Sequence, residues 1–321
     1  MYIIKAEILN EGTKNMEPYE LIEIKPKLNK TKVFFAILIV LTVLTLSIYS
    51  GIKSAEYAKG KDMQEAERIK NEQEQQILAE IAKEEEEKRL QQEAEKLRNA
   101  NPFTEDQMQA IENIYTAPEG EKRVFLTFDD GPTQSVTPFI LDLLKQENIK
   151  ATFFVLGNRA KSNPELIQRE FNEGHYIANH GYSHVYSQIY TNTQTVLDEY
   201  NYTENCIQEA LGNTNYHSRV FRFPGGSNGG YYNTIKQQAK NVLKDNNIAH
   251  LDWNCLSKDA EGAKTKEQLL QNVIATAGEK KSLVILMHDA SDKILTYETL
   301  PDVINYLRQN GYTFMNLYDI L

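Results

Sequence analysis

The fold is decided by the stretch Arg123-Val124-Phe125-Leu126-Thr127-Phe128-Asp129-Asp130-Gly131-Pro132. Its β-branched and aromatic first half predicts a strand, and Asp-Asp-Gly-Pro predicts that the strand stops there. Both carboxylates, Asp129 and Asp130, are therefore expected at the C-terminal tip of the strand. Because neighbouring strand residues point to different sides, one carboxylate can bind a cation while the other faces a water molecule next to that cation.

Similar apolar segments recur along the rest of the chain and alternate with helix-like segments. Strands are predicted at 123–128, 151–156, 176–178, 220–223, 249–254, 283–287 and 313–316. Apolar residues at three- and four-residue spacing predict helices at 138–146, 164–172, 194–211, 234–245, 266–277 and 298–309. This alternation predicts an α/β fold, a distorted and incomplete parallel (β/α) barrel of about seven strands. Barrel enzymes keep their sites at the C-terminal ends of the strands, where the acidic pair would lie.

Two histidines, His180 and His184, follow in Asn179-His180-Gly181-Tyr182-Ser183-His184. Their spacing aligns two imidazoles on one face of a helix or tight turn. Two histidines and one aspartate form a three-ligand set, which in zinc hydrolases leaves the fourth position to water. The residues therefore predict a divalent-metal site, most suited to zinc, although cobalt, nickel and iron accept the same ligands.

Two further strand tips end in residues that suit catalysis. Arg222 precedes a Pro-Gly-Gly turn, where its guanidinium can fork onto a carboxylate. His288 ends the apolar run 283–287 and is placed as a general acid. Taken singly, each feature has an ordinary explanation as a turn, a surface charge or a rim histidine. Their occurrence together indicates a metal-assisted hydrolase.

These motifs resemble, in order and spacing, those of the polysaccharide deacetylases, the NodB-homology group or carbohydrate esterase family four. The resemblance runs from roughly Lys122 to the C-terminus. The matching segments are Thr127–Pro132, His180 with His184, Arg222–Pro224 and Leu286–His288. The resemblance implies a hydrolase that removes acetyl groups from a polysaccharide with the help of a divalent metal.

The resemblance also implies a role for each site residue. Asp129 would be the catalytic base, oriented by Arg222. His288 would be the general acid, polarised by Asp259 in the segment 257–260. The three metal ligands would be Asp130, His180 and His184. Neutralisation by Arg222 and by Asp259 is expected to lower the pKa of the base and to raise that of the acid.

Two positions depart from the family pattern, and both concern the sugar groove. Ala260 stands where the family has Trp, and Gly225 stands where many members carry Tyr. Both changes remove aromatic surface, while the backbone N–H near Gly225 stays a candidate for the oxyanion hole. The predicted substrate contacts are Pro224, Gly225 and Leu286. Trp253, the single Trp, is either core packing, which indole favours, or a replacement sugar platform.

The chain ahead of the barrel predicts where the enzyme works. Residues 33–52 carry no charge and are long and apolar enough for one bilayer span. Lysines precede this stretch at Lys25, Lys27, Lys30 and Lys32, so the positive-inside rule places the N-terminus in the cytoplasm. A cleaved signal peptide is the alternative, although the apolar stretch exceeds a usual signal core. We therefore expect a single-pass protein of the cell membrane with its catalytic domain outside the cytoplasm.

The predicted order is a cytoplasmic segment (1–32), a transmembrane signal anchor (33–52), a charged helical stalk (53–117) and a polysaccharide deacetylase catalytic domain (118–321). Residues 55–99 are rich in Glu, Gln, Lys and Ala, contain no Pro, and carry a broken heptad of apolar residues. That heptad codes at best a weak coiled-coil self-association. A single charged helix and a partly disordered linker are the alternatives.

Composition limits the partners. The net charge of −10 argues against nucleic acid, whose binding relies on basic patches. The two cysteines, Cys206 and Cys255, lack metal-ligand spacing, and we expect free buried thiols rather than a bridge.

The sequence as a whole predicts hydrolysis of N-acetyl groups on a cell-wall glycan, with peptidoglycan N-acetylglucosamine as the first choice of substrate. The alternatives within the enzyme class are N-acetylmuramic acid, a chitin-like or secreted polysaccharide, and acetyl xylan. A wall-binding scaffold that has lost catalysis is the alternative from another class, and the complete set of site residues argues against it.

Overall fold

The computed structural model describes residues 34, 37–47, 68–83 and 102–321. The chain divides into two compact units, Met1–Glu86 and Glu87–Leu321.

In the first unit the described residues 37–47 and 68–83 are helical. The ion pair between Arg68 and Glu72, 3.1 Å long, joins side chains one turn apart on the second of these helices. The predicted stalk is thus helical over 68–83, while its parts 53–67 and 84–101 lie outside the described residues. Within the described residues, no helix has the length and apolarity that a membrane crossing needs. The predicted anchor is described only at residue 34 and over 37–47.

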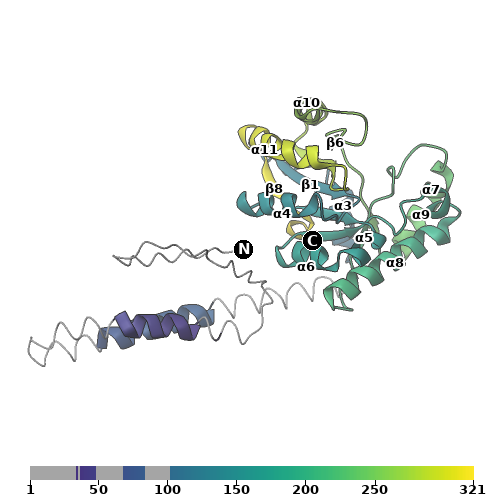
Figure 1. Cartoon of the computed structure of the whole chain (residues 1–321). Helices are drawn as coiled ribbons and strands as arrows, with labels where there is room; N and C mark the ends of the chain where they lie inside the picture. The colour runs from purple at the N-terminus through teal and green to yellow at the C-terminus, as the bar shows by residue number, and fades with distance from the viewer. Residues whose placement is uncertain (1–33, 35–36, 48–67, 84–101) are drawn as a thin grey trace, which may run out of the picture. The chain divides into compact units, whose positions relative to one another are not determined.

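The second unit alternates parallel strands with helices along most of its length (Figure 1). The strands are β1 (Arg123–Asp129), β2 (Thr152–Val155), β3 (Tyr176–Asn179), β4 (Val220–Phe221), β5 (Ala249–His250), β6 (Cys255–Leu256), β7 (Ser282–His288) and β8 (Thr313–Met315). The helices are α3 (Glu105–Glu112), α4 (Thr137–Gln146), α5 (Gly157–Ser162), α6 (Pro164–Asn172), α7 (Tyr186–Ile189), α8 (Thr193–Leu211), α9 (Asn233–Asp245), α10 (Lys266–Ala277) and α11 (Ile294–Gln309), with a final 3-10 turn η1 (Leu317–Asp319).

The strands form one parallel sheet in the order β5-β4-β3-β2-β1-β7-β6. β1 pairs with β7 along its whole length, from Arg123 opposite Ser282 to Asp129 opposite His288. The other edge of β1 is shared, because β8 pairs with its first half and β2 with its second half. The end strands β5 and β6 do not pair with each other within the described sheet. This topology confirms the predicted parallel, incomplete barrel.

Alternation along the strands separates two apolar clusters. Side chains such as Leu126 and Phe153 lie on the outer face of the sheet, where α10, α11, α4, α6 and α8 pack against one another in succession (Figure 1). Side chains such as Phe125, Phe154 and Val284 lie on the inner face and form a second cluster inside the curved sheet. Continuous apolar strands are expected when both faces of a parallel sheet are covered.

Helix α3 joins the inner cluster through Ile111, although the predicted domain boundary at 118 leaves this helix in the stalk. A capping box at Thr104 fixes where the helix begins. Arg123, at the first position of β1, donates hydrogen bonds to the carbonyl oxygens of Ile114 and Thr116, in the segment that follows the helix. These contacts lie at the N-terminal end of β1, so α3 packs at the end of the barrel opposite the strand tips.

The predicted elements agree with the structure except at short or polar segments. The predicted strand 249–254 is a strand only over Ala249–His250, which pairs with β4. The next strand, Cys255–Leu256, begins just beyond the predicted range and pairs with β7 at the opposite end of the sheet. The short helices α5 and α7 were not predicted, since they are too brief to show an apolar period. Cys206 and Cys255 are free and buried, as predicted.

Candidate active site

Asp129 is the last residue of β1, and only 2% of its side chain is exposed. Arg222, just beyond β4, is fully buried, and its Nη1 donates a 2.7 Å hydrogen bond to Asp129 Oδ1. The other oxygen, Oδ2, lies 3.7 Å from Nε2 of His180. The predicted base therefore lies between the predicted orienting arginine and one of the predicted metal ligands.

Arg222 is fixed through all three of its nitrogens. Nε donates to the carbonyl oxygen of Leu251 at 3.0 Å, and Nη2 donates to that of Asp252 at 3.1 Å. Nη1 also donates to Thr127 Oγ1 at 2.7 Å, and the guanidinium lies 3.8 Å from the ring centroid of Phe154. A planar fork bound in this way cannot turn without breaking several bonds, so it presents the carboxylate in one orientation.

The two histidines follow β3 in a turn, the second of the two geometries that their spacing predicts. Gly181 and His184 have left-handed backbone, with φ of 79° and 57°. The Nδ1 of His180 lies 2.8 Å from the carbonyl oxygen of Arg222 and must donate to it, because a carbonyl only accepts. The Nε2 atoms of His180 and His184 both face Asp130 Oδ1, at 3.6 and 3.3 Å.

These three residues fit a divalent metal. Ligand atoms of Asp130, His180 and His184 all lie within 4.8 Å of one another. Asp130 Oδ1 is buried and has no hydrogen-bond partner among the described residues, which is costly for a carboxylate unless a cation satisfies it. Burial lowers the pKa of His180 to about 3, so its imidazole is neutral, as a metal ligand must be. The structure thus brings together the metal ligands that the resemblance implied.

His288 ends β7, directly opposite Asp129 in the register of the neighbouring strand. Its Nδ1 lies 2.8 Å from Asp259 Oδ1, and its backbone N–H donates to Asp259 Oδ2 at 2.8 Å. Thr296 of α11 donates to the same Oδ2 at 2.7 Å. Asp259 therefore fixes both the ring and the backbone of the predicted acid.

The pKa of the predicted acid is shifted in the expected direction, whereas the pKa of the predicted base is not. Burial lowers the pKa of His288, but the hydrogen bond and charge of Asp259 outweigh it and raise the pKa to about 9. His288 is therefore protonated at neutral pH, as predicted. Burial raises the pKa of Asp129, and Arg222 and His288 only partly reverse this increase. The prediction of a lowered pKa for Asp129 was wrong in its net direction, because the carboxyl group is sealed from water.

Two threonines contribute to this arrangement that motif reasoning did not identify. Thr127 lies two residues before the base and accepts from Arg222, while Thr296 donates to Asp259 from another helix. Alternation along the strand could have indicated Thr127, since it shares a face with Asp129. No sequence signal pointed to Thr296, which is 37 residues away from its partner.

The predicted substrate contacts lie around the same strand ends. Pro224 is buried, and its carbonyl oxygen accepts a 2.6 Å hydrogen bond from the Tyr190 hydroxyl, whereas Gly225 is exposed. Leu286 is 6% exposed and lies on the face of β7 that also carries His288. Trp253 is half-buried and packs against the inner cluster, in agreement with the core interpretation.

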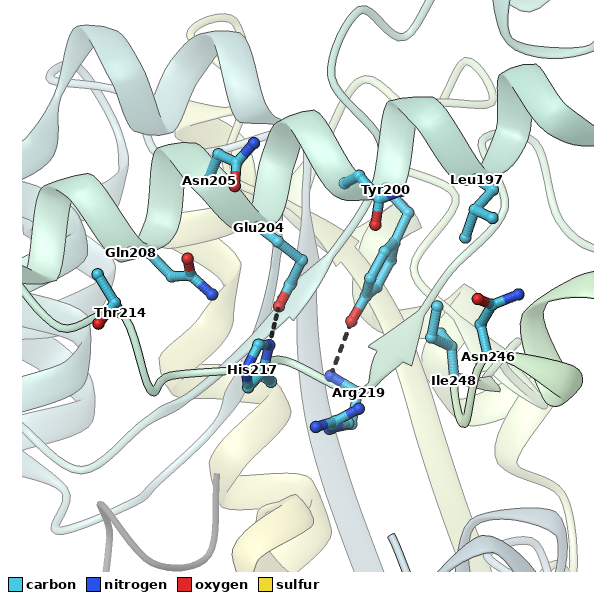
Figure 2. A pocket seen from close by; sticks show the side chains of 11 residues that line it. Leu197, Tyr200, Glu204, Asn205, Gln208, Thr214, His217, Arg219, Asn246 and Ile248 are labelled. Atoms are coloured by element: carbon cyan, nitrogen blue, oxygen red, sulfur yellow. Dashed lines mark hydrogen bonds and ion pairs between the residues drawn. The ribbon is translucent and has the colours of Figure 1, made fainter. Parts of the chain in front are cut away.

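A pocket of about 370 Å³ lies elsewhere, between α8 and the segment that leads into β4 (Figure 2). Its Glu204 accepts hydrogen bonds from Ser218 N at 3.0 Å and Asn179 Nδ2 at 3.1 Å, and lies 3.7 Å from His217 Nδ1. Arg219 immediately precedes β4, so the pocket lies towards the N-terminal end of that strand, opposite the strand tips that carry the catalytic cluster. The pocket contains none of the predicted site residues, and its buried carboxylate is satisfied by local partners.

Comparison with known proteins agrees with the geometry. A family model described as Polysaccharide deacetylase matches residues 116–244. A peptidoglycan-N-acetylglucosamine deacetylase of Bacillus cereus is 30% identical over 213 residues, which are 64% of this chain and 92% of that protein. The chain belongs to the polysaccharide deacetylase family.

Polysaccharide deacetylases of known structure share the fold of the second unit. A CE4 esterase of Streptococcus mutans has a TM-score of 0.58 and 34% identity, covering 67% of this chain and 91% of that one. The catalytic domain of a peptidoglycan N-acetylglucosamine deacetylase from Eubacterium rectale has a TM-score of 0.57 and 34% identity, covering 63% and 90%. A Listeria monocytogenes relative named peptidoglycan-N-acetylglucosamine deacetylase is 32% identical over 209 residues, which are 62% of this chain but only 39% of that protein.

Proposed function

We propose that this chain is a metal-dependent hydrolase that removes N-acetyl groups from a cell-wall glycan. The observation that carries the proposal is the meeting of three groups at the C-terminal ends of the strands. These groups are the triad Asp130, His180 and His184, the buried pair Asp129–Arg222, and the pair His288–Asp259. Such a set provides a cation site, a base and an acid within one cluster.

The residues divide the chemistry between them. A divalent cation bound by the triad, zinc being our first choice and cobalt, nickel or iron the alternatives, would polarise the acetyl carbonyl and lower the pKa of a water molecule. Asp129 accepts the proton of the attacking water, while Arg222 fixes its carboxylate and His180 lies beside it. Attack on the amide carbon gives a tetrahedral carbon with a negatively charged oxygen.

His288 completes the reaction by protonating the leaving amine, after which the carbon–nitrogen bond breaks and acetate leaves. Its raised pKa keeps the proton available at neutral pH. The Gly225 N–H makes no hydrogen bond within the described residues, and it lies exposed in the turn after Arg222. We assign this N–H to stabilisation of the oxyanion, as a preorganised donor at the strand ends.

Peptidoglycan N-acetylglucosamine is the substrate that we propose first, supported by the relatives from Bacillus cereus and Listeria monocytogenes that are named for this activity. N-acetylmuramic acid, chitin-like or secreted polysaccharides and acetyl xylan are the alternatives. A relative from Pseudobutyrivibrio xylanivorans, 30% identical over 209 residues, is named as a bifunctional xylanase/deacetylase, which supports acetyl xylan as an alternative. Hydrolysis of the amide and of the ester passes through the same kind of tetrahedral intermediate, so the same residues serve both.

The location that we propose is the outer side of the cell membrane, with residues 33–52 as a retained anchor, 1–32 in the cytoplasm and 53–117 as a spacer. This proposal is supported by the uncharged stretch and by the lysines that precede it. Protease treatment of intact cells tests it, because digestion of the catalytic domain without cell lysis is expected only for an outward-facing protein.

The substrate is tested by measuring acetate release by the purified full-length chain from isolated peptidoglycan, N-acetylglucosamine oligomers and acetylated xylan. Release from peptidoglycan, with free glucosamine found by mass spectrometry of the digested glycan, supports the proposal. Release only from oligomers or xylan would keep the enzyme and replace the substrate. No release from any of them by metal-loaded protein would favour the scaffold.

A further inference from the structure

The turn that follows Arg222 explains why glycine stands where many family members carry Tyr. Gly226 N donates to the carbonyl oxygen of Phe223 at 2.8 Å, and Gly225 has φ of 73°. With Pro224 at the second position, these features define a type II turn, whose third position requires left-handed backbone. Glycine adopts this backbone without the penalty that a side chain would add.

The space beside Gly225 is filled by another aromatic residue, Tyr186 of α7. A β-carbon built on Gly225 would lie 2.6 Å from the Tyr186 hydroxyl oxygen and 3.0 Å from Cζ of its ring. Tyr186 thus occupies the volume that a side chain at position 225 would enter. The two residues are separated by β4 and α8 in the chain, so motif comparison does not reveal this replacement.

Tyr186 is also next to the metal triad. Its ring centroid lies 5.6 Å from that of His184. Tyr190 supports it from behind, with ring centroids 5.9 Å apart, while the Tyr190 hydroxyl binds the carbonyl oxygen of Pro224. One side of α7 is thereby attached to the turn.

The Tyr186 side chain is partly exposed, and its polar group is available to a ligand. The residue is 40% exposed, and its hydroxyl makes no hydrogen bond in the part of the chain that the structure describes. On the other side of the same turn, a β-carbon on Gly226 would lie 3.2 Å from the ring of Trp253. The two glycines therefore lie against two aromatic rings, one half-exposed beside the triad and the other packed on the inner cluster.

We propose that Tyr186 is the aromatic wall of the glycan groove, packing its ring on the N-acetylated pyranose whose acetyl group faces Asp130, His180 and His184. The inference rests on the proposed function and names a residue that determines substrate binding. The apolar C–H face of a pyranose suits an aromatic ring, and the free hydroxyl can bind a sugar hydroxyl. Gly225 contributes by leaving room for the ring.

The test compares full-length Tyr186→Ala and Tyr186→Phe with the parent. Tyr202→Ala is the matched control, because Tyr202 is 60% exposed on α8 and its ring contacts Tyr182, with centroids 6.2 Å apart, rather than Gly225 or His184. For each protein, kcat and KM are measured with N-acetylglucosamine tetramer and with a small acetyl ester. Zinc content is measured by atomic absorption. Tetramer binding is followed by the fluorescence of Trp253, the single Trp of the chain.

Tyr186→Ala is expected to raise KM for the tetramer roughly tenfold, with a smaller change in kcat and a smaller effect on the small ester. The affinity for the tetramer, measured by the fluorescence titration, should fall by the same factor, while the zinc content stays at the parental value. Tyr186→Phe should keep most of the affinity because the ring remains, and Tyr202→Ala should match the parent.

The proposal would be contradicted if Tyr186→Ala had the same KM and the same affinity for the tetramer as the parent. A loss of zinc from Tyr186→Ala would also contradict it, because Tyr186 would then act by supporting His184. If the parent releases no acetate but binds the tetramer, the proposed function fails. The titration alone then decides the role of Tyr186.

Discussion

Arg222 and Asp129 form an ion pair with an Nη1–Oδ1 distance of 2.7 Å, and their side chains are 0% and 2% exposed. Asp129 ends β1 and Arg222 directly follows β4, so the pair joins two parts of the barrel that lie far apart in the sequence. A buried carboxylate and a buried guanidinium are each costly when alone. The pair therefore links the stability of the fold to the protonation state of the catalytic base.

Arg222→Ala is expected to destabilise the protein by about 3–5 kcal/mol, because it leaves Asp129 buried without its partner. Urea denaturation measures this loss. Arg308→Ala is the control: Arg308 pairs with Glu147 at the surface and is 47% exposed, so its loss should cost less than about 1 kcal/mol. Equal stability of Arg222→Ala and the parent would show that the pair has no such role.

In Asp259→Asn, the alkaline limb of the plot of kcat/KM against pH should move to lower pH. A general acid works only when protonated, so the parental rate should fall as the pH rises through about 9, the pKa of His288. Without the Asp259 charge, burial lowers that pKa, and the limb should move by roughly two pH units or more. Asp292→Asn, whose side chain is 71% exposed, should barely move the limb. An unmoved limb in Asp259→Asn would mean that His288 is not the titrating acid.

His180→Ala should abolish stoichiometric metal binding, since it removes one of three ligands whose atoms lie within 4.8 Å of one another. Metal content after dialysis is measured by atomic absorption. His217→Ala provides the comparison, because this histidine lies in the pocket beside Glu204 and should not affect the metal. Undiminished metal in His180→Ala would remove it from the ligand set.

Gly131→Ala tests the packing beneath the acidic pair. A β-carbon at Gly131 would lie 2.0 Å from Asp289 Oδ2, and this buried carboxyl is fixed by Thr137 at 2.6 Å. We expect a loss of about 3 kcal/mol or more by overpacking, measured by urea denaturation. Gly120→Ala, with φ of 82° and open space around it, should show only the backbone cost of about 1 kcal/mol. Similar losses for both variants would show that the core accommodates the added methyl group.

Long apolar segments made the barrel predictable from sequence. The runs that became β1 and β7 are buried on both faces, so their composition alone indicates parallel strands. Each catalytic motif follows such a run, and parallel strands bring their C-terminal ends to the same side of the sheet. That is why Asp129 and His288 could be placed together before the structure was known.

Features that depend on contacts between distant segments were not predictable. The replacement of a side chain at Gly225 by the ring of Tyr186 depends on how α7 packs against the turn. The raised pKa of Asp129 depends on burial, which no motif encodes. The segment 249–254 was predicted as one strand, because local apolar character does not show that pairing with β4 ends at His250 and that pairing with β7 begins only at Cys255.

The most direct test of the account is acetate release from peptidoglycan by the full-length chain, measured with and without a chelator and after zinc is restored, beside Asp129→Asn. We predict release that the chelator abolishes and zinc restores, and a loss of at least a hundredfold in Asp129→Asn, since removal of a general base costs about that much. Release that persists in chelator, or that continues at the parental rate in Asp129→Asn, would contradict the assignment of the metal triad and of the base.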